Sequence, residues 1–348
     1  MSCSDGSDQD ERLSDVEAEQ NAPRWRYVLH IAYYGTGLVG WQRQVEKSRS
    51  GQGSVQELME DAVTNALGAA KRINVTSASR TDAGTHALYQ YATIKVDQEL
   101  TVSLADLQRD LNERLPEQVR VLGLQPLPAS VKPSRFRSKY KKYIYYLQQG
   151  YRPDLELGKY SWFLGKRIDV MRLQEAISLL VGTHDFRPFS QGLQKAEFAD
   201  RSTVRTIVSA KVRVRRNVIF SLDPETCGNG DIIEDVNSLY DACAATEYDE
   251  PEAKKRKLDA NAKEPARPMV PVHFICVELI ATGFLRHMVR RIMGSVRPIA
   301  EGTYPVSRMQ QILDGELEPG PSAPTKGLWL HRTWLTQEDW DNDTIKDD

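Results

Sequence analysis

The segment SRTDAGTHA, residues 79–87, is the most informative stretch of this 348-residue chain. It lies between a candidate strand that leads into Ser79 and another from 91 to 96, so we expect it to form a loop. Gly84 allows the positive φ of a tight turn, and Asp82 lies two residues after Arg80. A loop carboxylate that Arg80 keeps ionised suits a nucleophile or base, although an Asp-Ala-Gly turn is more often only an Asx-turn.

Strand and helix patterns extend outward from this loop in both directions. Residues 27–34 are typical of a strand buried on both faces, and Ser54 with Glu57 forms a capping box before a helix. A second helix is expected to begin at Ser103. After Pro133 a similar order recurs: a Tyr-rich strand at 143–147, a helix at 170–181, strands near 204–214 and 274–280, and a helix from Phe284 to about residue 300. This predicts an α+β fold of two similar halves.

Composition sets the expected domain boundaries. Residues 1–23 are acidic and predicted to be a disordered tail, and residues 24–130 form the N-terminal half with the catalytic loop. Residues 131–336 form the C-terminal half, and residues 337–348 are a tail. A polar segment at 223–268 interrupts the C-terminal half, and we predict a disordered insertion because packed domains do not otherwise need so long a connection.

The charge distribution is uneven. The net charge is −2, but the acid is concentrated in the N-terminal tail and in the insertion, so the remaining body is basic. The four cysteines show no CxxC spacing, which argues against a disulfide framework and a metal site. No apolar run is long enough to span a membrane, and the N-terminus lacks a secretory h-region. These features are compatible with a protein that binds nucleic acid.

A second motif points to a different class of protein. Gly35, Gly37 and Gly40 spell GxGxxG directly after a strand, as in dinucleotide-binding proteins. That motif requires a helix to begin at the loop, whereas a polar stretch with Gly51 and Gly53 follows here. We therefore favour glycines in a tight loop, and a nucleotide-dependent oxidoreductase becomes the weaker alternative.

The loop at 79–87 resembles the GRTDAGVHA signature of the TruA family of tRNA pseudouridine synthases. Ser79 and Thr85 replace the usual glycine and valine, and the serine form is similar to the animal pseudouridine-synthase-like branch. Further blocks match in register: YGT at 34–36 with GWQ at 40–42, SVQ at 54–56, KYIY at 142–145, GTHDFRPF at 182–189, GFL at 283–285 with MVR at 288–290, and AP at 323–324 with GLWL at 327–330.

The resemblance implies a fold, a reaction and a catalytic centre. The fold would be two ferredoxin-like halves whose antiparallel sheets join over a central basic cleft. The enzyme would isomerise uridine to pseudouridine in tRNA, in the anticodon stem-loop by analogy, after flipping the base out of the stack. Asp82 would be the nucleophile, Tyr143 would stack on the uracil and serve acid-base chemistry, and Arg290 would pair with Asp82. No cofactor and no metal are implied.

Other residues are candidates for contacts with the RNA. The resemblance implies substrate contacts by Arg80, Arg135, Phe186 and Phe284, although the phenylalanine expected three residues before Arg135 is Lys132. Alternate basic residues along one strand suit phosphate contacts, and Arg286 lies on the predicted helix from Phe284, on the face opposite its apolar residues. Solvation of a charged face is the competing interpretation of these basic residues. The RNA-backbone candidates are Lys211, Arg213, Arg215 and Arg286.

Several points stay open at the level of sequence. The family leads us to expect tRNA as the partner and a homodimer as the assembly. The basic cluster Lys254–Lys257 favours the nucleus or cytoplasm, with the mitochondrion as the alternative. A non-catalytic tRNA-binding protein or RNA chaperone would keep the basic residues yet tolerate loss of Asp82. The target uridine and the first covalent adduct are not determined by these motifs.

Overall fold

A computed structural model describes residues 25–44, 53–127, 136–150, 153–192, 202–234 and 272–343. Arg135, the acidic tail at 1–23 and the cluster Lys254–Lys257 lie outside the described residues. Within these ranges, no helix combines the length and apolar character that a membrane span needs.

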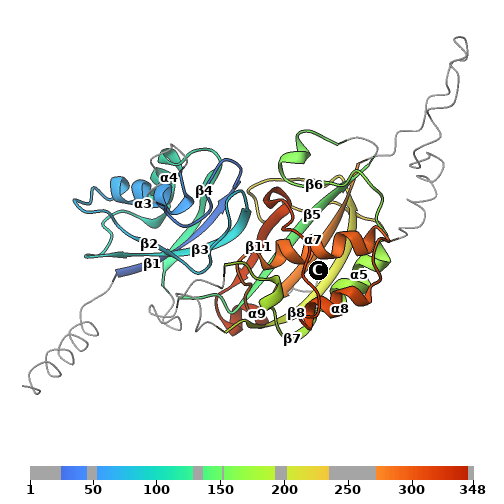
Figure 1. Ribbon diagram of the computed structural model, residues 1–348. Helices are drawn as coiled ribbons and strands as arrows, with labels where there is room; N and C mark the ends of the chain where they lie inside the picture. The colour runs from blue at the N-terminus through green and yellow to red at the C-terminus, as the bar shows by residue number, and fades with distance from the viewer. Residues whose placement is uncertain are drawn as a thin grey trace, which may run out of the picture.

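One continuous sheet runs through the molecule, in the strand order β4-β1-β3-β11-β5-β10-β8-β7 (Figure 1). Three short strands pair at its margins, β2 with β3, β6 with β5 and β9 with β8. The strands are β1 (Trp25–Tyr33), β2 (Val75–Ser77), β3 (His86–Val96), β4 (Val119–Pro126), β5 (Tyr140–Gln149), β6 (Trp162–Phe163), β7 (Gly182–Asp185), β8 (Val204–Arg216), β9 (Asp231–Ile232), β10 (His273–Ala281) and β11 (Leu328–Trp334). The helices are α3 (Val55–Ala66), α4 (Leu104–Arg114), α5 (Val170–Ser178), α7 (Met288–Ala300), α8 (Ser307–Leu313) and α9 (Gln337–Asp341).

Each half of the chain repeats the same supersecondary pattern. The N-terminal half runs β1-α3-β2-β3-α4-β4 and pairs its strands in the order β4-β1-β3-β2. The main elements of the C-terminal half run β5-α5-β8-β10-α7-β11, and their strand order is β11-β5-β10-β8. Both are βαββαβ units with the strand order of a ferredoxin-like fold. The prediction of an α+β fold built from two similar halves is confirmed.

The two halves meet where β3 pairs in parallel with β11. His86 and Ala87, at the start of β3, lie opposite Trp329 and Leu330, whereas the later residues 92–94 of β3 pair with β2. The loop between β2 and β3, which carries SRTDAGTHA, therefore emerges at the junction of the halves.

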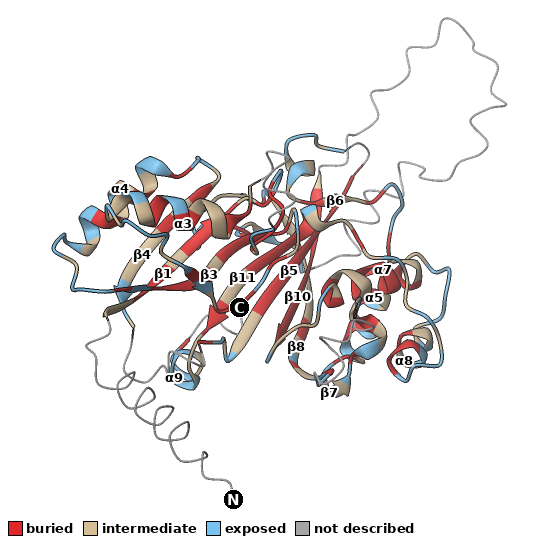
Figure 2. Ribbon diagram, turned by 60° about the vertical axis from the view of Figure 1, so that its left-hand side comes forward, coloured by how far each residue is buried: buried red, intermediate tan, exposed pale blue. Residues whose placement is uncertain are grey.

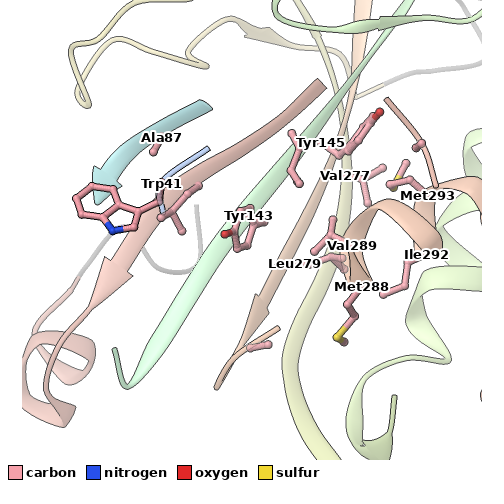
Figure 3. Packing of buried hydrophobic residues seen from close by; sticks show 14 of the residues in the cluster. Trp41, Ala87, Tyr143, Tyr145, Val277, Leu279, Met288, Val289, Ile292 and Met293 are labelled. Carbon is pink, nitrogen blue, oxygen red and sulfur yellow. The ribbon is translucent and has the colours of Figure 1, made fainter. Parts of the chain in front are cut away.

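The larger core lies between the sheet and the helices. Buried residues of α3, α4, α5 and α7 belong to one cluster with alternate residues of β1 and β5, including Tyr143 and Tyr145. Figure 2 shows these helices beside the sheet, with β1 and β5 mostly buried. In Figure 3, Met288 and Val289 of α7 lie over the same face of the sheet as Tyr143. A smaller cluster that includes Ile144 and Tyr146 covers the opposite face. The face with the helices is therefore the one that carries Tyr143.

Three boundaries differ from the predictions. The helix expected from Phe284 begins at Met288, because His287 has φ of 61° and cannot continue a right-handed helix. Part of the expected insertion is ordered, since β9 pairs with β8 and Cys227 is buried. Part of the expected tail forms α9, which Thr336 begins with a capping box.

Candidate active site

The loop that carries Asp82 is held by backbone contacts with residues 38–41. The amide of Trp41 donates to the Thr81 carbonyl at 3.2 Å, and the amide of Gly84 donates to the Leu38 carbonyl at 3.2 Å. The loop also closes on itself, because the amide of Thr85 donates to the Asp82 carbonyl at 3.1 Å. These bonds fix the backbone on both sides of Asp82 and hold its carboxylate at a defined position.

The GxGxxG glycines allow this close approach. A Cβ on Gly35 would lie 2.2 Å from the Thr85 carbonyl oxygen, and a Cβ on Gly40 would lie 2.6 Å from the Thr81 carbonyl oxygen. Neither separation is tolerated by real side chains. No helix begins at these glycines, because α3 starts at Val55. The motif thus packs against the loop of Asp82, as the tight-loop interpretation requires.

Two basic side chains approach the carboxylate of Asp82. Arg290 Nη1 and His287 Nε2 each lie 3.6 Å from Asp82 Oδ2, and the Asp82 side chain is 28% exposed. Among the described residues, both contacts involve the same oxygen, which leaves Oδ1 available to a ligand. Arg290 and His287 thus hold the Asp82 carboxylate from one side, and a carboxylate is a group that can serve as a nucleophile.

His287 was missed by the sequence analysis. Its left-handed backbone, with φ of 61°, is uncommon for a residue other than glycine and brings the imidazole against Asp82. Burial lowers the pKa of His287, Asp82 opposes this shift, and the nearby arginines add to it. The imidazole is therefore mainly neutral at pH 7. The spacing of three residues to Arg290 was no guide, because His287 lies before the first residue of α7 and does not share its helical geometry.

Tyr143 lies beside this carboxylate on β5. Its ring packs edge-on against Phe284 with 5.1 Å between the ring centroids, and it is almost fully buried. Burial raises the pKa of Tyr143, and the nearby Tyr33 and Asp82 raise it further. Its hydroxyl therefore stays protonated at neutral pH and can donate a hydrogen bond. Tyr143 and Phe284, which the sequence analysis assigned to the site, do lie together.

Residues 323–327 form a strap that positions Arg290. Arg290 Nε donates to the Ala323 carbonyl at 2.7 Å, and the Ala323 amide donates back to the Arg290 carbonyl at 2.9 Å. The Tyr145 hydroxyl donates to the Pro324 carbonyl at 2.6 Å. The strap therefore connects α7 to β5 close to Tyr143.

The same strap contacts the loop of Asp82. Thr325 packs on Gly84 so closely that a Cβ there would lie 2.6 Å from Thr325 Oγ1. His86 connects the strap to the first glycine loop, because its Nε2 lies 3.2 Å from the Lys326 carbonyl and its Nδ1 accepts from the Gly35 amide at 3.2 Å. The strap thus fixes Asp82 and Arg290 relative to each other.

Two further predicted substrate residues, Phe186 and Arg80, differ in burial. Phe186 is fully buried and packs against His184 and Phe189, so it is a core residue and does not face a ligand. Its motif suggested a substrate contact, but its apolar ring is buried in the core. Arg80 is exposed, and among the described residues the basic partners of Asp82 are Arg290 and His287.

The basic residues of β8 lie on the other face of the sheet. Arg213 pairs in register with Cys276, whereas Tyr143 pairs with Leu279, so the two side chains point to opposite faces. Lys211 and Arg215 share the face of Arg213, whose Nε also lies 3.3 Å from Glu278. The structure therefore does not bring these three residues to Asp82. Arg286 is exposed and directly precedes His287.

Comparison with known proteins adds an independent finding. A family model described as tRNA pseudouridine synthase matches residues 176–333, which contain Arg290 and the strap. A tRNA pseudouridine synthase A from Thermodesulfovibrio yellowstonii is 29% identical over 306 residues, which are 87% of this chain and 97% of that protein. Proteins of the same name from Roseiflexus sp. (28% identical; 87% of this chain, 88% of that protein) and Bordetella petrii (27% identical; 92% and 94%) are also similar.

Proposed function

We infer that this chain, a member of the TruA-type family of tRNA pseudouridine synthases, isomerises uridine to pseudouridine in tRNA. The observation that carries the proposal is the pairing of Asp82, from the loop between β2 and β3, with Arg290 of α7 at 3.6 Å beside Tyr143. The two halves of the chain each supply part of this centre. An ionised carboxylate at the junction is the group that the reaction requires.

In the proposed reaction, Asp82 is the nucleophile, and the bond that it forms with the nucleotide is broken again so that the free carboxylate is regenerated. The bond between N1 of the uracil and C1′ of the ribose breaks, and a bond between C5 and C1′ forms in its place. The hydrogen on C5 leaves as a proton, and N1 takes up a proton. Substrate and product are isomers, so the atoms balance without an oxidant, a reductant or an organic cofactor.

The other side chains have separate proposed roles. Arg290 orients the Asp82 carboxylate from Oδ2 and leaves Oδ1 to meet the nucleotide. Tyr143 and Phe284 supply aromatic surface for the flipped uracil, and the neutral Tyr143 hydroxyl donates a hydrogen bond. The strap keeps these groups in register through its bonds to Arg290 and Tyr145.

Finer assignments are proposals that rest on the sequence resemblance. They are an anticodon-arm uridine as the target, membership of the animal pseudouridine-synthase-like branch, and a homodimer as the assembly. The same basis supports three candidate RNA contacts, which are Arg80, Arg135 and Arg286.

The direct test uses unmodified tRNA that carries tritium at C5 of its uridines. Isomerisation must release that label, so we expect release by the native chain and none by Asp82→Asn. Asp110→Asn is the matched control, because Asp110 is a carboxylate on α4 whose partner is Arg114. If the native chain and Asp82→Asn bind tRNA equally and neither releases label, the protein is a non-catalytic tRNA binder.

A further inference from the structure

Beyond Tyr143, the same face of the sheet carries a group of donors with no carboxylate among them. Lys141 precedes Tyr143 by two residues on β5, so both side chains leave the same face, about 7 Å apart along the strand. Lys141 pairs in register with Thr333 of β11 on one side and with Ala281 of β10 on the other.

Lys141 differs sharply from its neighbour in the sequence. Lys142, on the opposite face, is buried and lies 2.8 Å from Glu278. Lys141 is half-buried, and within the described part of the chain its ammonium has neither a hydrogen bond nor an ion pair. Burial and the nearby charge of Arg205 lower the pKa of Lys141 to about 8, so most molecules carry this charge at pH 7. A partly buried cation without a counter-ion destabilises the free protein.

Two further donors lie next to Lys141. Thr333 is 4% exposed, and its hydroxyl is a buried polar atom without a hydrogen-bond partner in the described residues. Directly opposed residues on antiparallel strands have Cβ atoms roughly 5 Å apart, so this hydroxyl is within reach of the Lys141 side chain. Arg205 adds a guanidinium, which is anchored by Nη1 bonds to the Ser202 and Val204 carbonyls at 2.8 and 2.6 Å.

The position of Arg205 links this group to the candidate active site. Arg205 Nε lies 3.6 Å from the point that a Cβ on Gly283 would occupy, and the next residue, Phe284, packs on Tyr143. The Arg205 side chain thus lies next to Gly283, the residue before the one that packs on Tyr143. The three donors and the aromatic pair form one continuous stretch of this face.

We propose that Lys141, Thr333 and Arg205 form a subsite for a phosphate group of the substrate RNA, next to the nucleotide that reacts at Asp82. This inference rests on the proposed function. A phosphodiester offers a negative charge to the two cations, Lys141 and Arg205. Its oxygens can also accept a hydrogen bond from the unpaired hydroxyl of Thr333. The free protein keeps an unfavourable charge that substrate binding neutralises.

Lys141→Met tests the subsite through the Tm and the tRNA affinity, which we expect to change in opposite directions. Removal of an unpaired cation should raise the Tm, while tRNA binding should weaken about tenfold at physiological salt. The slope of log K against log salt should become shallower by about one, because one phosphate contact is lost. Affinity is measured with unmodified tRNA in an Asp82→Asn background, so that no turnover occurs.

Lys142→Met and Thr333→Val are the matched variants. Lys142→Met should lower the Tm, because it leaves Glu278 buried with one basic partner fewer. Thr333→Val should weaken tRNA binding without changing the salt slope, since it removes a hydroxyl and no charge. A Lys141→Met protein with native affinity and native slope, or with a lowered Tm, overturns the subsite. Absence of tritium release by a native chain that binds tRNA would instead overturn the proposed reaction.

Discussion

Gly37 and Gly40 have similar left-handed backbone angles but different surroundings. Their φ values are 80° and 94°, and a Cβ on Gly37 would meet no atom within 4 Å, whereas one on Gly40 would lie 2.6 Å from the Thr81 carbonyl oxygen. Alanine costs about 1 kcal/mol of backbone strain at either position. Only at position 40 does it also displace the loop of Asp82.

We therefore predict that Gly40→Ala abolishes tritium release and lowers the free energy of unfolding by more than the strain alone. Gly37→Ala should lose about 1 kcal/mol of stability and keep its activity. Urea unfolding and the label-release assay check both variants. Equal activity of the two proteins would show that the loop does not depend on this approach.

Single residues were predictable to different degrees. Asp82, Tyr143 and Arg290 were selected through motif resemblance, and the structure brings them together. His287 was not selected, because its role depends on a left-handed backbone that no local pattern indicates. Phe186 was selected wrongly, since a motif marks that a position is constrained without showing whether the core or a ligand constrains it.

Strand β5 carries two neighbouring tyrosines, Tyr145 and Tyr146, whose hydroxyls have different surroundings. Tyr145 donates to the Pro324 carbonyl at 2.6 Å and so ties the strap to the strand. Tyr146, on the opposite face, has a buried hydroxyl without a partner in the described residues. Removal of the Tyr145 hydroxyl leaves its acceptor, the Pro324 carbonyl, without that hydrogen bond. Removal of the Tyr146 hydroxyl breaks no hydrogen bond and takes away a buried polar group that has no partner.

Tyr145→Phe should thus destabilise the protein by about 1–3 kcal/mol and reduce label release, because the strap also holds Arg290. Tyr146→Phe should leave stability equal or higher and activity unchanged. Urea unfolding with label release measures both. If Tyr146→Phe lowered the free energy of unfolding and the label release as much as Tyr145→Phe, this account of the strap would be contradicted.

Elements were predictable where local pattern determines them. The alternation at 211–215 correctly indicated one basic face on β8, but no local feature says which side of the sheet that face occupies. The start of α7 was placed four residues too early, because apolar spacing continues through Phe284 and Leu285. The side of the sheet that the basic face of β8 occupies and the residue at which α7 begins are both decided by packing against distant elements.

At the scale of the whole molecule, the sequence resemblance predicted two halves joined over a basic cleft but did not indicate which strands join them. The parallel contact of β3 with β11 links residues about 240 positions apart, at His86 and Trp329. Pairing over such a separation leaves no local pattern. It nevertheless determines function, because this joint carries the loop of Asp82 to the half that supplies Arg290.

The joint should also be sensitive to acid through His86. Its Nδ1 accepts from the Gly35 amide, so the ring is neutral with its proton on Nε2, which faces the Lys326 carbonyl. A second ring proton would destroy the Gly35 contact. Burial lowers the pKa of His86 to about 4, and burial likewise lowers the pKa of His30 to about 4 and that of His331 to about 3.

The sign of the pH effect follows from these three histidines. An unfolded histidine has a pKa near 6.5, so between pH 6.5 and 4 the unfolded chain binds protons that the folded chain excludes. The free energy of unfolding must then fall as the pH is lowered through this window. For His86 alone the loss at pH 5 is about 2 kcal/mol, because one pKa unit corresponds to about 1.4 kcal/mol.

His86→Gln, whose amide does not titrate, should reduce the slope of unfolding free energy against pH by about one proton, as urea titrations at pH 7, 6 and 5 would measure. A native slope near zero in this window would contradict the prediction. A steep native slope that His86→Gln leaves unchanged would assign the acid sensitivity to His30 and His331, away from the strap.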